Sequence, residues 1–141
     1  MAQDFGLQVS AYVETYKKRM RATAREAVEE TVAIAQEERP PEGSGRMPII
    51  TGFLRASLVG KVGSMPAGQS QGDPETSYEF NIASVSAALL TWDPNDGTPF
   101  FAGWTAVYAR QAEYRHGFMR GATELWTDTV ERVAKQVSKR I

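Results

Sequence analysis

The sequence contains no cysteine and a single histidine, and each scarcity removes a class of function. Without thiols the chain cannot form a disulfide, a thiolate metal site or a cysteine nucleophile. One imidazole, that of His116, cannot hold a metal ion by itself, and no serine, threonine or lysine motif indicates a nucleophile for it to activate. We therefore predict that the chain is not an enzyme, and we expect neither a metal nor a cofactor.

Long hydrophobic runs and a strong net charge are also missing. No stretch approaches the roughly 18 apolar residues of a membrane helix, and the N-terminal segment lacks the basic and apolar regions of a signal peptide. The formal charge of −1 gives no general attraction to nucleic acid or to a membrane surface. These absences predict a soluble, unprocessed chain. A length of 141 residues with 42% hydrophobic residues predicts that it folds as one domain over residues 1–141.

The first part of the chain has the spacing of a long helix. From Leu7 to about Glu38, apolar or small side chains recur at steps of three and four residues, and neither glycine nor proline interrupts them. Pro40 and Pro41 end the pattern. Its members are Val9, Tyr12, Val13, Tyr16, Met20, Ala24, Ala27, Val28, Thr31 and Ala35.

The length of this helix carries a prediction about assembly. A helix of about 30 residues is ~45 Å long, whereas a compact chain of this size has a diameter of only ~37 Å. The helix is therefore expected to overhang its own domain. An apolar stripe on the overhang would need to be covered by another chain.

The rest of the sequence predicts a small sheet and a second helix. A flexible loop is expected at about residues 39–50, followed either by Thr51 as the N-cap of a short helical turn or by a simple turn before a strand. Strands are predicted within 57–65, 76–86 and 100–109, with a turn at "WDPNDGTPF", and an amphipathic helix from Phe118 to the end. The predicted fold class is α+β: a long N-terminal helix, a small, mainly antiparallel β-sheet and a C-terminal amphipathic helix.

Basic side chains gather in the first helix, at Lys17, Lys18, Arg19, Arg21 and Arg25, and glutamates follow them. This order opposes the helix macrodipole. One interpretation is a solvated face with local pairs, such as Arg25 with Glu29. Another is a surface that meets oppositely charged partners, including copies of the same chain. A third is contact with phosphate, although no aromatic residues are interleaved with the basic ones.

Three segments, in this order, resemble the tail-completion, or head-tail joining, proteins of long-tailed bacteriophages. "TGFLRASL" is similar to the family's TG-x-L-R-x-S signature, "VYARQAEYRHG" to its YA-x-x-x-E-x-G segment, and "FMRGA" to the PF-L-R-x-A that opens its last helix. The residues that match the second and third segments are Tyr108, Ala109, Glu113, Phe118 and Arg120. The resemblance covers roughly residues 5–141, but Gly117 stands where the family has proline.

The resemblance implies a structural virion protein of a phage or a phage-derived gene transfer particle, assembled in the host bacterial cytoplasm. Such proteins form a ring at the neck, hexameric or following the symmetry of the connector, between the head connector or stopper and the tail terminator or tail tube. Genome DNA would pass through the lumen without specific binding. The predicted partner-binding residues are Lys17, Lys18, Arg21, Arg46, Thr51, Gly52, Leu54 and Arg55.

Two alternatives stay open. The first is a tail terminator, which caps the tail tube and stops its growth. The second belongs to a different class: a small hydrolase or ligand-binding α+β domain with His116, Glu113 and Asp93 around a pocket. Neighbouring genes would separate the two virion proteins, and a pocket containing the histidine would favour the hydrolase.

Overall fold

The computed structural model describes residues 2–37, 47, 52–73, 75–79 and 82–141, and its fold is α+β. A long helix, α1 (Ala2–Ala35), precedes a two-stranded antiparallel sheet and a series of C-terminal helices. The strands are β1 (Leu58–Val62) and β2 (Phe100–Trp104), and the other elements are α2 (Phe53–Ala56), α3 (Ala83–Thr91), the 3-10 helix η1 (Pro94–Asp96), α4 (Ala109–His116), α5 (Phe118–Glu124) and α6 (Trp126–Arg140).

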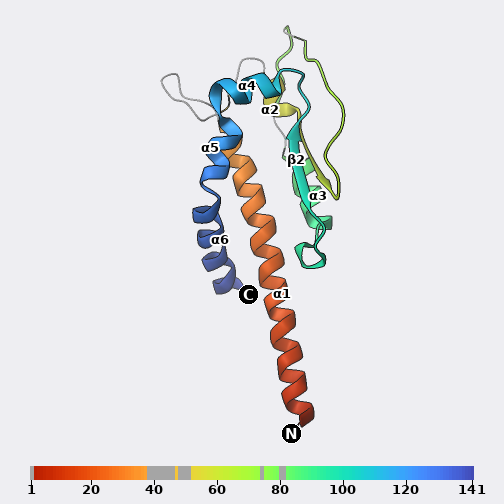
Figure 1. Cartoon of the computed structure of the whole chain (residues 1–141), viewed down its shortest axis with the longest axis vertical. Coiled ribbons are helices and arrows are strands. Elements are labelled where there is room, and N and C mark those ends of the chain that lie inside the picture. The colour runs from red at the N-terminus through yellow and green to blue at the C-terminus, as the bar shows by residue number, and fades with distance from the viewer. Residues whose placement is uncertain (1, 38–46, 48–51, 74, 80–81) are drawn as a thin grey trace.

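Helix α1 runs along most of the long axis of the molecule, and α2 and α4 lie beyond its C-terminal end (Figure 1). Helices α5 and α6 lie on one side of its C-terminal half, and the sheet with α3 lies on the other, while the N-terminal half projects away from the rest of the chain. The buried half contributes to three hydrophobic clusters, through Ala35, Val32 and Ala27 respectively. The domain is therefore built around residues 21–35 of one helix.

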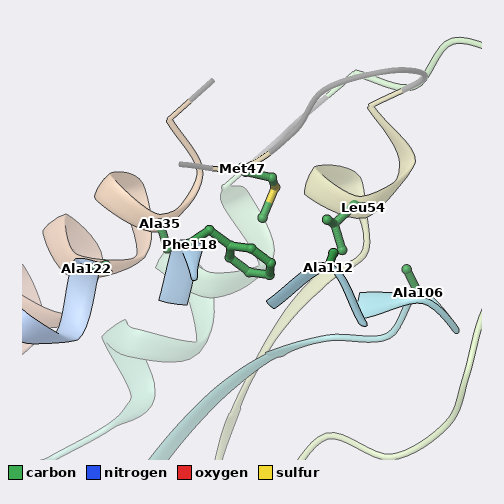
Figure 2. Packing of buried hydrophobic residues seen from close by; sticks show 7 residues of the cluster. All are labelled: Ala35, Met47, Leu54, Ala106, Ala112, Phe118 and Ala122. Carbon is green, nitrogen blue, oxygen red and sulfur yellow. The ribbon is translucent and has the colours of Figure 1, made fainter. Parts of the chain in front are cut away.

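The first cluster joins α1 to the middle and the end of the sequence. Figure 2 shows its central Phe118 ring between Met47 and Ala112, and its seven buried members are Ala35, Met47, Leu54, Ala106, Ala112, Phe118 and Ala122. The Trp104 ring packs edge-on against Phe118, with centroids 5.0 Å apart. An edge-to-face pair of this kind adds about 0.5–1.5 kcal/mol beyond the area that it buries.

A buried amide ties the end of α1 to this cluster. Gln36 is only 3% exposed, yet both of its amide atoms are paired. Its Oε1 accepts a hydrogen bond from Trp104 Nε1 at 2.6 Å, and its Nε2 donates to the Arg55 carbonyl oxygen at 2.9 Å. A buried amide without partners would cost about 1–3 kcal/mol. The two hydrogen bonds remove this cost for Gln36, and the bond to Trp104 also fixes the orientation of the indole ring.

The other two clusters attach α3 and α6. Val85 and Leu89 of α3 pack over β1, where a Cβ on Gly60 would lie 3.1 Å from the Val85 Cα atom, so glycine permits the close approach. On the opposite side of α1, Val133 and Val137 of α6 pack against Ala27. Ion pairs flank this contact: Arg140 meets Glu26 at 2.8 Å, and Arg132 meets Glu30.

The structure confirms the fold class, the long helix and the strands within 57–65 and 100–109; it corrects two expectations and adds one helix. The strand predicted at 76–86 is wrong, because residues 83–91 form α3: Ile82, Val85 and Leu89 also fit a helical spacing, and alanine and leucine favour a helix. The single helix predicted from Phe118 to the end is two helices, α5 and α6, which are separated at Leu125. Helix α4 was not expected at all. The loop prediction for 39–50 lies outside the described residues except at Met47, which is fully buried.

Gly52, rather than the expected Thr51, occupies the N-cap position of α2. Its φ of 82° lies in the left-handed region, which side chains other than glycine rarely adopt. A Cβ at this position would also overlap the carbonyl oxygen of Tyr78. The turn that brings "FLRA" onto the core therefore requires a glycine.

We predict that Gly52→Ala lowers the free energy of unfolding by at least about 2 kcal/mol, through backbone strain and the overlap with Tyr78. Gly103→Ala is the matched control, because the space beside Gly103 is open and its φ is not positive. Urea unfolding followed by circular dichroism measures both changes. Equal stabilities of the two variants would show that the turn does not depend on Gly52.

Candidate assembly surface

The projecting half of α1 carries a stripe of large, exposed apolar side chains. From Asp4 to Met20, every side chain but that of Thr15 is classed as exposed. Six of these residues form what we call the α1 stripe: Phe5, Val9, Tyr12, Val13, Tyr16 and Met20, with exposed fractions of 69, 46, 76, 41, 61 and 41%. At 3.6 residues per turn the six fall within an arc of ~100°. They form one continuous surface rather than scattered apolar residues.

The α1 stripe continues into the core. Ala27 and Ile34 fall within the same arc: Ala27 is fully buried against α6, and Ile34 is partly buried against the first cluster. One helix face is therefore covered by the chain's own elements over its second half and uncovered over its first half. Exposed apolar surface of this extent in a monomer typically marks an interaction site. The stripe was not among the predicted site residues, although the helical spacing and the helix length together identify it.

The predicted basic cluster divides into two groups. Lys17 and Lys18 are exposed on α1, and Lys17 lies 3.9 Å from Glu14 in a local ion pair. Arg21 instead pairs with Asp93 of its own chain at 3.3 Å. Its guanidinium therefore contributes to attaching the turn after α3 to α1, and a contact of Arg21 with a partner stays a prediction.

Arg25 is also used within the domain rather than in the local pair with Glu29 that was considered. Its guanidinium donates to the Trp92 carbonyl oxygen from two nitrogens, at 2.9 and 2.6 Å, and to the Leu90 carbonyl oxygen at 3.0 Å. These carbonyls lie at the C-terminal end of α3, where the helix leaves acceptors without partners. Arg25 thus caps α3 from α1.

Asp93 organises the turn after α3, where the sequence predicted a turn. Its Oδ1 accepts the Asn95 backbone N–H at 2.9 Å. That hydrogen bond, and further the Arg21 guanidinium, hold the pKa of Asp93 below its ordinary value of 3.8, while desolvation acts in the opposite direction. Within the part of the chain that the structure describes, no group of three or more histidine or acidic side chains could hold a metal ion.

We predict that Asp93→Asn destabilises the protein at neutral pH but not in strong acid. Asparagine can still accept the Asn95 N–H, but it loses the ion pair with Arg21. Because the pKa of Asp93 is lower in the folded than in the unfolded chain, its contribution is complete above pH ~4 and is lost as pH falls through the folded-state pKa. The urea midpoints of parent and variant should therefore differ at pH 7, and the difference should shrink as the pH is lowered progressively below 4. A gap between parent and variant that is independent of pH would contradict this.

The "TGFLRASL" segment is used mainly inside the subunit. Leu54 is 3% exposed in the first cluster, so its predicted contact with a partner is not available. Arg55 lies beside it, partly exposed, and its carbonyl oxygen accepts the hydrogen bond from Gln36. Arg46 and Thr51 lie outside the described residues.

The three family-like segments meet in space. Leu54, Ala112 and Phe118 share the first cluster (Figure 2). Tyr108, immediately before Ala109 at the start of α4, lies near Phe53 with ring centroids 6.4 Å apart. Partial burial raises the pKa of the Tyr108 hydroxyl above 10.0, and a hydrogen bond with the Leu54 backbone acts in the opposite direction. The motifs therefore have structural roles that do not require a partner.

Glu113 makes the corner between α4 and α5. The carboxylate accepts the backbone N–H groups of Met119 at 2.8 Å and Arg120 at 3.0 Å, so it caps the next helix. Gly117 permits the corner with a φ of 63°, and the Arg120 guanidinium lies over it. Negative charge at a helix N-terminus satisfies free N–H groups and is favoured by the macrodipole. Within this segment Glu113 therefore caps α5, and Phe118 packs in the first cluster.

We predict that Glu113→Ala lowers the free energy of unfolding by about 1–2 kcal/mol, as the loss of a helix cap does. Glu113→Gln should cost less, because its amide oxygen can still accept one of the N–H groups. Gln111→Ala, an exposed change on the same helix, serves as the control and should stay within about 0.5 kcal/mol of the parent. Urea denaturation gives all three values. If Glu113→Ala changed the free energy of unfolding no more than Gln111→Ala does, the capping role would be excluded.

A hollow of about 340 Å³ lies beside this corner, next to β2. Its walls include the apolar side chains of Met65, Trp104, Phe118 and Met119. Glu113 is at its edge, whereas His116 and Asp93 do not line it. The three polar residues of the hydrolase alternative therefore do not surround this hollow. Asp93 and Glu113 are each engaged in hydrogen bonds that stabilise a turn or a helix.

Comparison with known proteins identifies no relative: no protein-family model, no curated protein and no solved structure matches this chain. The resemblance to phage tail-completion proteins therefore stays a prediction from the three motifs. Among the described helices, none is both long and apolar enough to cross a membrane.

Proposed function

We propose that this chain is a structural assembly subunit of a long-tailed phage or phage-like particle. It forms a ring at the head-tail junction and joins the head connector to the tail, as the three ordered motifs suggest. The observation that carries the proposal is the α1 stripe, which projects from a complete domain and is left without cover in the single chain (Figure 1). An uncovered apolar surface of this extent fits a subunit that is covered by another chain in an assembly.

Two further observations support an assembly role. Two of the three residues of the hydrolase alternative have structural roles: Asp93 organises a turn and Glu113 caps a helix. The exposed Lys17 lies beside the stripe near the point where the stripe enters the domain, so it can contribute charge complementarity next to an apolar contact, whereas Lys18 lies on the opposite face of α1. Charges in that position govern specificity and association rate more than affinity. Partners would be copies of this chain and the ring proteins above and below it.

The proposal is tested by deleting the gene in the producing cell and examining the particles by electron microscopy. We expect filled heads and finished tails of normal length that fail to join, and we expect the purified protein to restore joining in the lysate. Tails of abnormal length would instead favour the tail terminator, because that protein stops tube growth. Normal, infectious particles without the protein would overturn both assignments.

A further inference from the structure

We propose that two copies of the free protein pair through their α1 stripes in antiparallel orientation, with the two-fold axis between Tyr12 and Val13. The occupant of the exposed stripe in the isolated protein is then the same stripe of a second copy. The inference concerns the protein before assembly. It does not depend on the proposed function, because it follows from the surface of α1 alone.

The order of residues along the stripe is the first argument. Steps of four, three, one, three and four residues separate Phe5, Val9, Tyr12, Val13, Tyr16 and Met20, and this series reads the same in both directions. A two-fold interface must be self-complementary. In antiparallel register Phe5 of one copy meets Met20 of the other, Val9 meets Tyr16, and Tyr12 meets Val13. Every apolar member of the stripe obtains an apolar partner.

The size of the stripe is the second argument. Its three aromatic residues are 61–76% exposed and together present on the order of 400 Å² per copy, and the two valines and the methionine add to this. A stable protein interface buries about 800 Å² per partner. The stripe alone supplies most of that area. The two domains lie at opposite ends of such a pair, so the contact is made by the stripes and not by the domains.

Charge is the third argument, and it determines the orientation. Lys17 and Arg19 flank the stripe near its end, and in antiparallel register the segment 17–21 of one copy lies opposite 4–8 of the other, which contains no basic residue. The two copies of Lys17 are then ~13 Å apart along the axis, beyond a Debye length of ~8 Å at physiological ionic strength. A parallel pair would instead bring the two basic segments together.

The pair and the proposed ring are different states of the same surface. A two-fold contact closes on itself and cannot propagate around a ring. The pair would therefore open when a subunit enters the particle, and it would keep the stripe covered until then. This last step rests on the proposed function, whereas the pairing itself can be measured on the purified protein.

Cysteine cross-linking tests the orientation directly, because the natural sequence contains no cysteine. The variants are F5C and M20C, at positions that the antiparallel register places opposite one another. We expect a disulfide-linked dimer when the two purified variants are mixed and oxidised, and little from either variant alone. Efficient self-linking of F5C would indicate a parallel pair and overturn the proposal.

The affinity test uses sedimentation equilibrium over a range of concentrations. We expect the parent to dimerise and Tyr12→Glu to raise the dissociation constant at least about thirtyfold, as removal of an interface hot spot does. Leu7→Glu is the matched control: Leu7 is 69% exposed, as Phe5 is, but it lies on the opposite face of α1. It should change the constant less than about threefold.

Circular dichroism of each variant shows whether α1 stays helical, so a loss of pairing is separated from a loss of folding. A parent that remains monomeric at all concentrations would overturn the pairing, whether or not a different chain covers the stripe in the particle. So would an equal effect of Tyr12→Glu and Leu7→Glu. Failure of the gene-deletion test would leave these measurements unaffected.

Discussion

The packing of all other elements against the second half of α1 is the interaction on which the structure depends. Its small side chains, Ala27 and Ala35, let α6 and α5 approach closely, and Val32 faces the cluster beneath α3 and β1. A two-stranded sheet is marginal by itself in water. Here it is stable because α3 covers β1 and α1 completes the same cluster. Arg21 and Arg25 of α1 then attach the turn after α3 through one ion pair and three hydrogen bonds.

The same helix has two different surroundings along its length, and this difference gives the functional hypothesis. Its apolar face is continuous, but the chain has elements to cover only the second half (Figure 1). Burial of apolar surface contributes about 25 cal/mol per Å². An exposed stripe of several hundred Å² therefore represents a large free energy that a second chain can recover. A pair of free subunits and a ring in a particle are two ways to recover it.

The residues of the motifs that suggested the phage family each have a structural role within this fold. Gly52 permits a left-handed turn, Leu54 and Phe118 meet in one cluster, and Glu113 caps α5. Their order along the sequence therefore reflects how three distant segments close one core. Residues of this kind identify a fold more directly than they identify a binding surface, which is why Leu54 proved to be buried and Arg21 to be paired within its own chain.

The sequence by itself determined the features that depend on local periodicity and length: the long helix, its overhang, the two paired strands, the turn at Asp93 and the α+β class. Patterns with one clear period, sustained over many residues, allow few alternatives. Only the tertiary structure decided that residues 83–91 are helical, because Ile82, Val85 and Leu89 fit both periods and packing on β1 selected one. It also decided that Arg21 pairs within its own chain, since Asp93 lies far from Arg21 in sequence and meets it only when α3 packs on the sheet beside α1. Contacts between distant segments are set by the shape of the whole core, which no local pattern contains.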